Sequence, residues 1–142
     1  MRPYCKDNYR IISALKSRRI ELGISLREIA SACGLYPNSI EQFLNPNNSP
    51  KMDNLVMVGE TLGVGFSTNT STGHKLSAYA LVEHLAMVRK DQEISTRELA
   101  TMTGITQPSI SNILSHKIMP TLNTYLLIGE ALDVDLEMYF ED

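Results

Sequence analysis

Apolar residues recur at three- and four-residue spacing through most of the chain, as in helices that bury one face. Ile11, Ile12 and Leu15 show this spacing first, and Gly23 follows as a helix stop. The pattern predicts helices over residues 8–22, 37–44, 53–62, 77–90, 96–103, 107–115 and 122–132, and a short helical turn over 136–140. Because no stretch alternates as a half-buried strand does, the predicted fold class is all-α.

Residues 96–114 have the spacing of two short helices joined by a tight turn. Ala100 is small enough for the second helix to pass closely over the first, and Gly104 can take the positive φ that ends a helix. Ile110 and Ile113 are three positions apart, so they share the face that points into the core. This stretch is predicted to be a compact helix pair.

The same spacing occurs seventy residues earlier, where Ala30, Gly34, Ile40 and Phe43 hold the equivalent places. The register continues without a gap when residues 10–66 are set against residues 80–136. Identical pairs include Leu15/Leu85, Arg19/Arg89, Ser25/Ser95, Arg27/Arg97, Glu28/Glu98, Ser39/Ser109, Pro50/Pro120, Gly59/Gly129, Glu60/Glu130 and Val64/Val134. We interpret this as an internal duplication, with domains at residues 1–66 and 76–142 and a polar linker at 67–75.

Each copy carries a helix-start signal at the same place. Ser25 with Glu28 and Ser95 with Glu98 have the capping-box spacing, in which the serine caps the helix and the glutamate reaches back. A unit of about 60–65 residues buries only a thin core and is marginally stable alone. We therefore expect the copies to pack together, or the chain to form a homodimer.

The net charge of −3 is unevenly distributed. Residues 1–66 carry eight Lys/Arg against six Asp/Glu, whereas residues 76–142 carry four against ten. A polyanionic partner is therefore favoured by the first copy more than by the second. The acidic residues of the second copy could lie on a side away from a ligand.

Several function classes find no support. Cys5 is expected in a loosely ordered tail over residues 1–7 and Cys33 in a core, and the three histidines are too scattered for a metal site. The absence of a signal peptide or long apolar run indicates a cytoplasmic, reduced protein. With no Gly-rich phosphate loop, nucleophile–base pair or paired carboxylates, we expect neither enzyme activity nor a cofactor.

Both copies resemble the helix-turn-helix domain of the Cro/C1 (XRE) family, the small modules of lambdoid phage repressors. The resemblance is carried by residues 16–23 (KSRRIELG), 39–43 (SIEQF) and 106–113 (TQPSISNI). It implies two tandem lambda-repressor-like domains of four or five helices each, in a bacterial or phage-type regulator. Such domains bind double-stranded DNA by placing the helix after the turn in the major groove.

On that resemblance, the outer face of the helix after the turn supplies base contacts. The first copy offers Tyr36, Asn38, Gln42 and Asn45, and the second offers Thr106, Gln107, Ser111 and Asn112. Gln42 and Asn112 are the strongest candidates, because an amide donates and accepts at once and so matches the N6/N7 edge of adenine. Glu41 could accept from cytosine N4 or could point away and repel phosphate. Since the two helices differ, they should read different sequences.

Arginines at the start of the helix before the turn are the first candidates for phosphate contact, as is common in the family. These are Arg27 and Arg97, with Lys51 and Lys117 in later loops as second candidates.

One feature departs from the family. In many of these repressors the arginine equivalent to Arg19 or Arg89 pairs with an acid at the end of the recognition helix, and here that place holds leucine. Glu60 and Glu130 are candidate substitute partners. Without such pairing, the two arginines would be free to reach phosphate.

We expect a sequence-specific, double-stranded DNA-binding transcription regulator that reads a bipartite site with two non-identical recognition helices. Repression by promoter occlusion is the default mechanism. Two alternatives remain open: an activator that contacts RNA polymerase through the acidic second copy, and a protein-interaction module such as an antitoxin.

Overall fold

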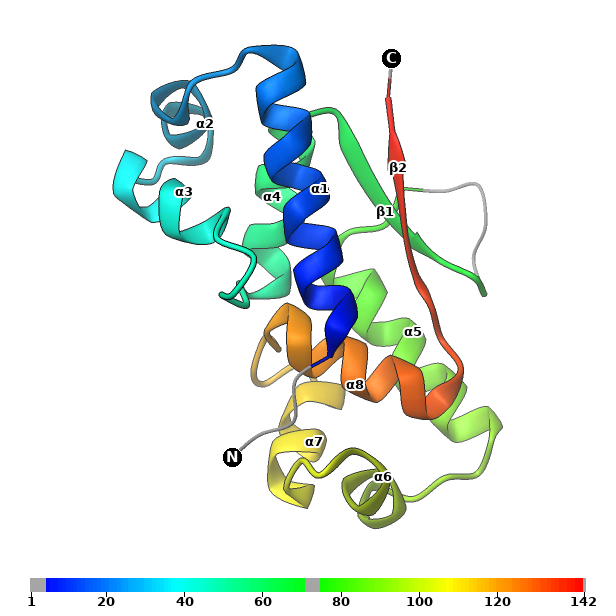
Figure 1. The fold of residues 1–142 in the computed structure, drawn as a ribbon. Coiled ribbons are helices and arrows are strands. Elements are labelled where there is room, and N and C mark those ends of the chain that lie inside the picture. Colours follow the sequence, from blue (N-terminus) through cyan, green and yellow to red (C-terminus); the bar gives the residue numbers. More distant parts are fainter. Residues whose placement is uncertain (1–4, 71–74, 142) are drawn as a thin grey trace.

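The computed structural model describes residues 5–70 and 75–141, and within them eight helices and two strands (Figure 1). The first unit comprises α1 (Lys6–Leu22), α2 (Leu26–Cys33), α3 (Pro37–Phe43), α4 (Met52–Thr61) and β1 (Val64–Thr68). The second unit comprises α5 (Ala78–Asp91), α6 (Thr96–Thr103), α7 (Gln107–Leu114), α8 (Leu122–Leu132) and β2 (Leu136–Phe140). No helix in the described ranges is long and apolar enough to cross a membrane.

The local signals that predicted the helices have their expected geometry. Ser25 accepts from the backbone N–H of Glu28 at 3.0 Å, and Ser95 accepts from that of Glu98 at the same distance, which completes both capping boxes. Gly104, after α6, takes a φ of 76°, a conformation that glycine adopts without a Cβ clash.

The prediction of an all-α fold is wrong at two places. β1 and β2 pair antiparallel, and residues 136–140 form a strand instead of the expected helical turn. All five residues of β1 are buried, so the strand lacks the alternation of apolar and polar residues that would have revealed it. Its partner follows some seventy residues later, a pairing that no local pattern encodes.

The strands and the first helix change two smaller expectations. Ser67 and Thr68, the first residues of the expected linker, are buried in β1, and residues 71–74 lie outside the described ranges. Cys5 is buried instead of lying in a loose tail, because its backbone N–H donates to Asn123 Oδ1 at 2.6 Å. Residues 1–4 also lie outside the described part, and the division into two domains stays a prediction.

The two units share one hydrophobic core. Buried residues of both, among them Ile12, Val58, Leu81 and Tyr125, belong to a single cluster. α1 packs against α8, and α4 packs against both α5 and α8. Burial of apolar surface is the main stabilising term in folding, so each unit depends on the other for part of its stability.

A second connection between the units lies before α4 and α8. Lys51 and Thr121 form an isolated antiparallel bridge. Its neighbours exchange two backbone hydrogen bonds, Met52 N–H to Pro120 O at 2.9 Å and Leu122 N–H to Pro50 O at 2.7 Å. The loops that follow α3 and α7 are thereby joined.

Candidate nucleic-acid interface

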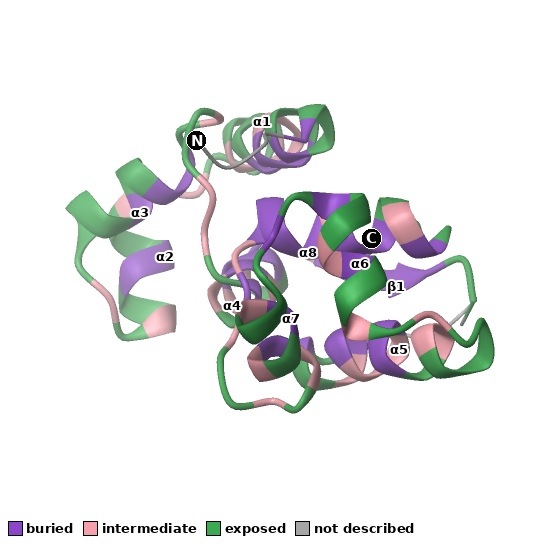
Figure 2. Cartoon of the chain, turned by 90° about the horizontal axis from the view of Figure 1, so that it is seen from below, coloured by how far each residue is buried: buried purple, intermediate pink, exposed green. Residues whose placement is uncertain are grey.

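Each unit contains two short helices joined by a tight turn. Gly34, with φ 69°, follows the end of α2, and α3 begins at Pro37; Gly104 likewise follows α6, and α7 begins at Gln107. Ile40 and Phe43 on α3 are buried, as are Ile110 and Ile113 on α7. Because one face of each helix is fixed in the core, the opposite face is presented to solvent (Figure 2).

The eight candidate base-contacting residues lie on that solvent face. Seven are exposed, namely Tyr36, Asn38, Gln42, Asn45, Thr106, Gln107 and Ser111, and Asn112 is half-buried. Tyr36 stands out, with 81% of its surface exposed directly before α3. Exposure makes these side chains available for base contact, which itself stays a prediction.

One side chain of this face is oriented by its neighbour. Gln107 Nε2 donates to Thr96 Oγ1 at 3.0 Å, across the angle between α7 and α6. The amide oxygen of Gln107 therefore keeps a defined direction at the start of α7. Leu26 and Pro37 hold the equivalent places in the first unit and cannot make this bond. Sequence analysis missed Thr96, because its contact depends on how the two helices dock.

The four candidate phosphate contacts also lie on the surface. Arg27 and Arg97 are exposed in the first turns of α2 and α6. Lys51 is exposed as the N-cap residue of α4, and Lys117 is exposed in the loop after α7. A guanidinium or ammonium at these places can approach a phosphate from the helix pair without entering a groove.

The expected pairing of Arg19 and Arg89 with glutamates is wrong. Arg19 Nη1 donates to the carbonyl of Ile24 at 3.0 Å, and Arg89 Nη1 donates to that of Ile94 at 2.9 Å. Both arginines are half-buried and fasten the end of the first helix of their unit to the residue before the capping serine. Their tether limits how far they could reach toward a phosphate.

Glu60, the expected partner of Arg19, faces Lys75 instead. The Lys75 ammonium lies 3.4 Å from a carboxylate oxygen of Glu60 and 3.4 Å from one of Glu141. Sequence reasoning could not foresee this, because Glu141 follows β2 and reaches Lys75 only through the pairing of the two strands.

Comparison with known families gives a match in the second unit. Residues 85–138 match the family model HTH_3, described as helix-turn-helix. This match supports a Cro/C1-type helix-turn-helix domain in the second unit. The match runs from the middle of α5 into β2, so it includes the α6–α7 pair and the candidates Arg97, Gln107 and Asn112. Neither the curated proteins nor the solved structures gave a match to the chain.

The helix-turn-helix domain has little negative charge where it would meet DNA. Residues 107–118, which form α7 and the loop after it, contain no Asp or Glu. Asp133 caps the end of α8, Asp135 lies between α8 and β2, and Glu137 lies in β2. The acidic residues of the second unit therefore lie outside α7 and the loop that follows it, whereas α6 carries Glu98.

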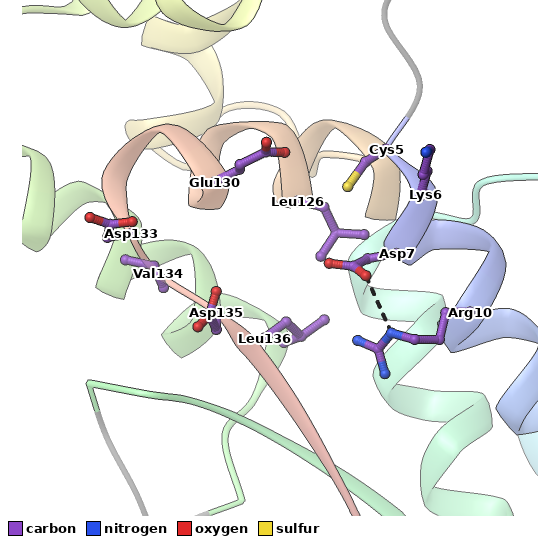
Figure 3. A pocket seen from close by; sticks show the side chains of 10 residues that line it. All are labelled: Cys5, Lys6, Asp7, Arg10, Leu126, Glu130, Asp133, Val134, Asp135 and Leu136. Carbon is purple, nitrogen blue, oxygen red and sulfur yellow. Dashed lines mark hydrogen bonds and ion pairs between the residues drawn. The ribbon is translucent and has the colours of Figure 1, made fainter.

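A hollow of about 680 Å³ lies where α1, α8 and β2 meet (Figure 3). Its walls include the carboxylates of Asp7, Glu130, Asp133 and Asp135, and Asp7 is paired with Arg10 at 3.2 Å. Burial raises the pKa of the Cys5 thiol at its rim, which keeps that thiol protonated and poorly nucleophilic. An excess of acid over base does not suit a phosphate, so this hollow is not part of the candidate interface.

Proposed function

We propose that this protein is a transcription regulator that binds double-stranded DNA sequence-specifically and reads a bipartite site with α3 and α7. The observation that carries the proposal is the outward face of α7, which is polar, uncharged and part of a helix-turn-helix domain. Domains of this architecture place the second helix of the pair in the major groove.

α7 supplies the better-defined half of the proposed site. Gln107 and Asn112 carry amides that match the N6/N7 edge of adenine, and Thr96 holds Gln107 in place at 3.0 Å. Short side chains such as Ser111 let the helix approach the base edges closely. Arg97 and Lys117 provide phosphate contacts on either side of α7.

α3 is proposed to read a different half-site. Tyr36, Asn38, Gln42 and Asn45 are exposed at its outer face, and Glu41 adds an acceptor for cytosine N4. All five positions differ from their counterparts in the second unit, so the two half-sites should differ in sequence. Arg27 and Lys51 complete the phosphate contacts of the first unit.

Occlusion of a promoter follows most directly from such binding, so we propose repression as the default mechanism. β2, which carries Glu137 and follows Asp133 and Asp135, lies apart from α3 and α7 (Figure 1), which supports contact with RNA polymerase as a second route of regulation.

Selection of bound sites from random duplex DNA with the full chain tests this function. The proposal predicts two motifs at a fixed spacing. A lack of enrichment at low and moderate salt would contradict DNA binding and favour a protein partner instead.

A further inference from the structure

The two connections between the units join residues with the same separation in sequence. The bridge joins Lys51 to Thr121, and the two-stranded sheet joins Ser67 to Glu137. In both pairs the residues are seventy positions apart, which is the offset that aligns the first unit with the second. Each connection therefore pairs a position with its own equivalent.

An antiparallel pairing of equivalent positions defines the relation between the units. A repeat related by translation contacts its neighbour through two different surfaces, whereas a two-fold rotation uses the same surface twice. The hydrogen bonds Met52 N–H to Pro120 O and Leu122 N–H to Pro50 O exchange into one another when each residue is replaced by its equivalent. The packing of α1 on α8 and of α5 on α4 is reciprocal in the same way.

We propose that a single chain is a pseudo-dimer, in which an internal two-fold axis presents α3 and α7 to two half-sites of opposite orientation. The inference rests on the proposed function and specifies its DNA ligand as an imperfect inverted repeat, bound by one chain. The pseudo-dimer differs from the expected homodimer. In a homodimer the two-fold contact joins two chains, whereas here it joins the two units of one chain.

The arrangement of the helices agrees with this axis. The axis passes through the Ser67–Glu137 pair and the Lys51–Thr121 bridge. In Figure 1 the sheet lies at the upper right, whereas α3 lies at the left and α7 lies below the centre. Both helices are thus on the side of the molecule away from the sheet.

Because the natural half-sites differ, their relative orientation cannot be read from a selected sequence. Making the two helix faces identical removes this difficulty. The first graft gives α3 the outer residues of α7 through Tyr36→Thr, Pro37→Gln, Asn38→Pro, Glu41→Ser, Gln42→Asn and Asn45→Ser. All six positions are exposed, and the buried Ile40 and Phe43 are left unchanged.

The reverse graft is the matched variant. It can be tested even if the first graft does not fold. It gives α7 the outer residues of α3 through Thr106→Tyr, Gln107→Pro, Pro108→Asn, Ser111→Glu, Asn112→Gln and Ser115→Asn. Far-UV circular dichroism and the unfolding midpoint establish that each variant is folded before it is tested.

Site selection from random duplex DNA is then run on the wild type and on each graft. The pseudo-dimer predicts that each graft enriches a perfect inverted repeat, built from one half-site of the wild-type motif. It also predicts binding to that repeat at least about tenfold tighter than to the same half-sites placed as a direct repeat, because reversal of one half-site forfeits its base contacts.

The other outcomes separate the two proposals. Enrichment of a direct repeat, or of a single half-site, would overturn the pseudo-dimer and leave DNA binding intact. Absence of enrichment with the wild type and both folded grafts would overturn both.

Discussion

Ser67 pairs with Glu137 in the two-stranded sheet, and the two residues are equivalent positions of the two units. The sheet therefore joins the units at their mutual axis and gives each of them a strand neighbour that it does not have alone. A two-stranded sheet has little stability in water unless it packs on a core. Here Phe66 supplies that packing from the middle of β1, with 1% of its surface exposed.

Replacement of Phe66 by alanine should destabilise the whole chain by about 3–5 kcal/mol, through loss of buried apolar surface and the cavity left behind. Unfolding in urea, followed by far-UV circular dichroism, should remain a single transition with a lower midpoint. Phe140→Ala is the matched control, because that ring is 50% exposed, and it should cost less than about 1 kcal/mol. Two separate transitions in Phe66→Ala would contradict a shared core.

Gly129 and Gly59 are equivalent glycines with different surroundings. A Cβ on Gly129 would lie 2.6 Å from the backbone oxygen of Val134, whereas one on Gly59 would first meet the Phe66 ring at 2.9 Å. A ring can shift more easily than a backbone. Gly129→Ala should therefore cost about 1–3 kcal/mol, as overpacking does. Gly59→Ala should cost less, and the same urea experiment compares them; equal costs would contradict the backbone argument.

Asn112→Ala tests base reading by α7. Loss of a bidentate contact should weaken binding to the selected site by about 1–3 kcal/mol and relax the preference at one base position. Fluorescence anisotropy with the selected duplex and with random duplex measures both effects. If Asn112→Ala weakened binding to both duplexes equally, Asn112 would not be a base-reading residue.

Arg27→Ala tests phosphate contact and should behave differently. It should weaken binding to selected and random duplexes similarly and reduce the slope of log K against log salt by about 0.9, the value for one lost contact with B-DNA. Anisotropy titrations over a range of salt concentrations give this slope. An unchanged slope would place Arg27 outside the interface. Arg10→Ala is the control, because Arg10 lies on α1 and is paired with Asp7.

The buried phenol of Tyr125 predicts a loss of stability at high pH. Burial raises the pKa of Tyr125 well above its ordinary value, and its hydroxyl donates to the carbonyl of Leu81 at 3.2 Å. In the folded state the phenol thus stays neutral, whereas in the unfolded state it ionises near pH 10. The contribution of Tyr125 to the free energy of unfolding is therefore complete below about pH 10 and declines above it. Unfolding free energies measured from pH 8 to 11 should fall less steeply in Tyr125→Phe than in the wild type. Parallel declines would contradict this role.

The features that could be predicted from the sequence are those that adjacent residues determine. Ser25 and Ser95 begin helices through contacts three residues away, and Gly104 ends one through its own φ, so the helices and the outward faces of α3 and α7 were within reach. β1 was not, because its partner is distant and both its faces are buried. The bond from Arg19 to the carbonyl of Ile24 was missed because every residue has a backbone carbonyl, so the side chain at that position does not indicate the acceptor. Thr96 was missed because its bond to Gln107 depends on a docking angle.

The most direct test of the account is the number of chains on one selected duplex, measured by native mass spectrometry with a duplex that carries both motifs. A pseudo-dimer predicts one chain per duplex, with α3 on one half-site and α7 on the other. Scrambling either motif should lower the affinity, but the complex that remains should still contain one chain per duplex. Two chains on one duplex, each needing a single motif, would contradict it.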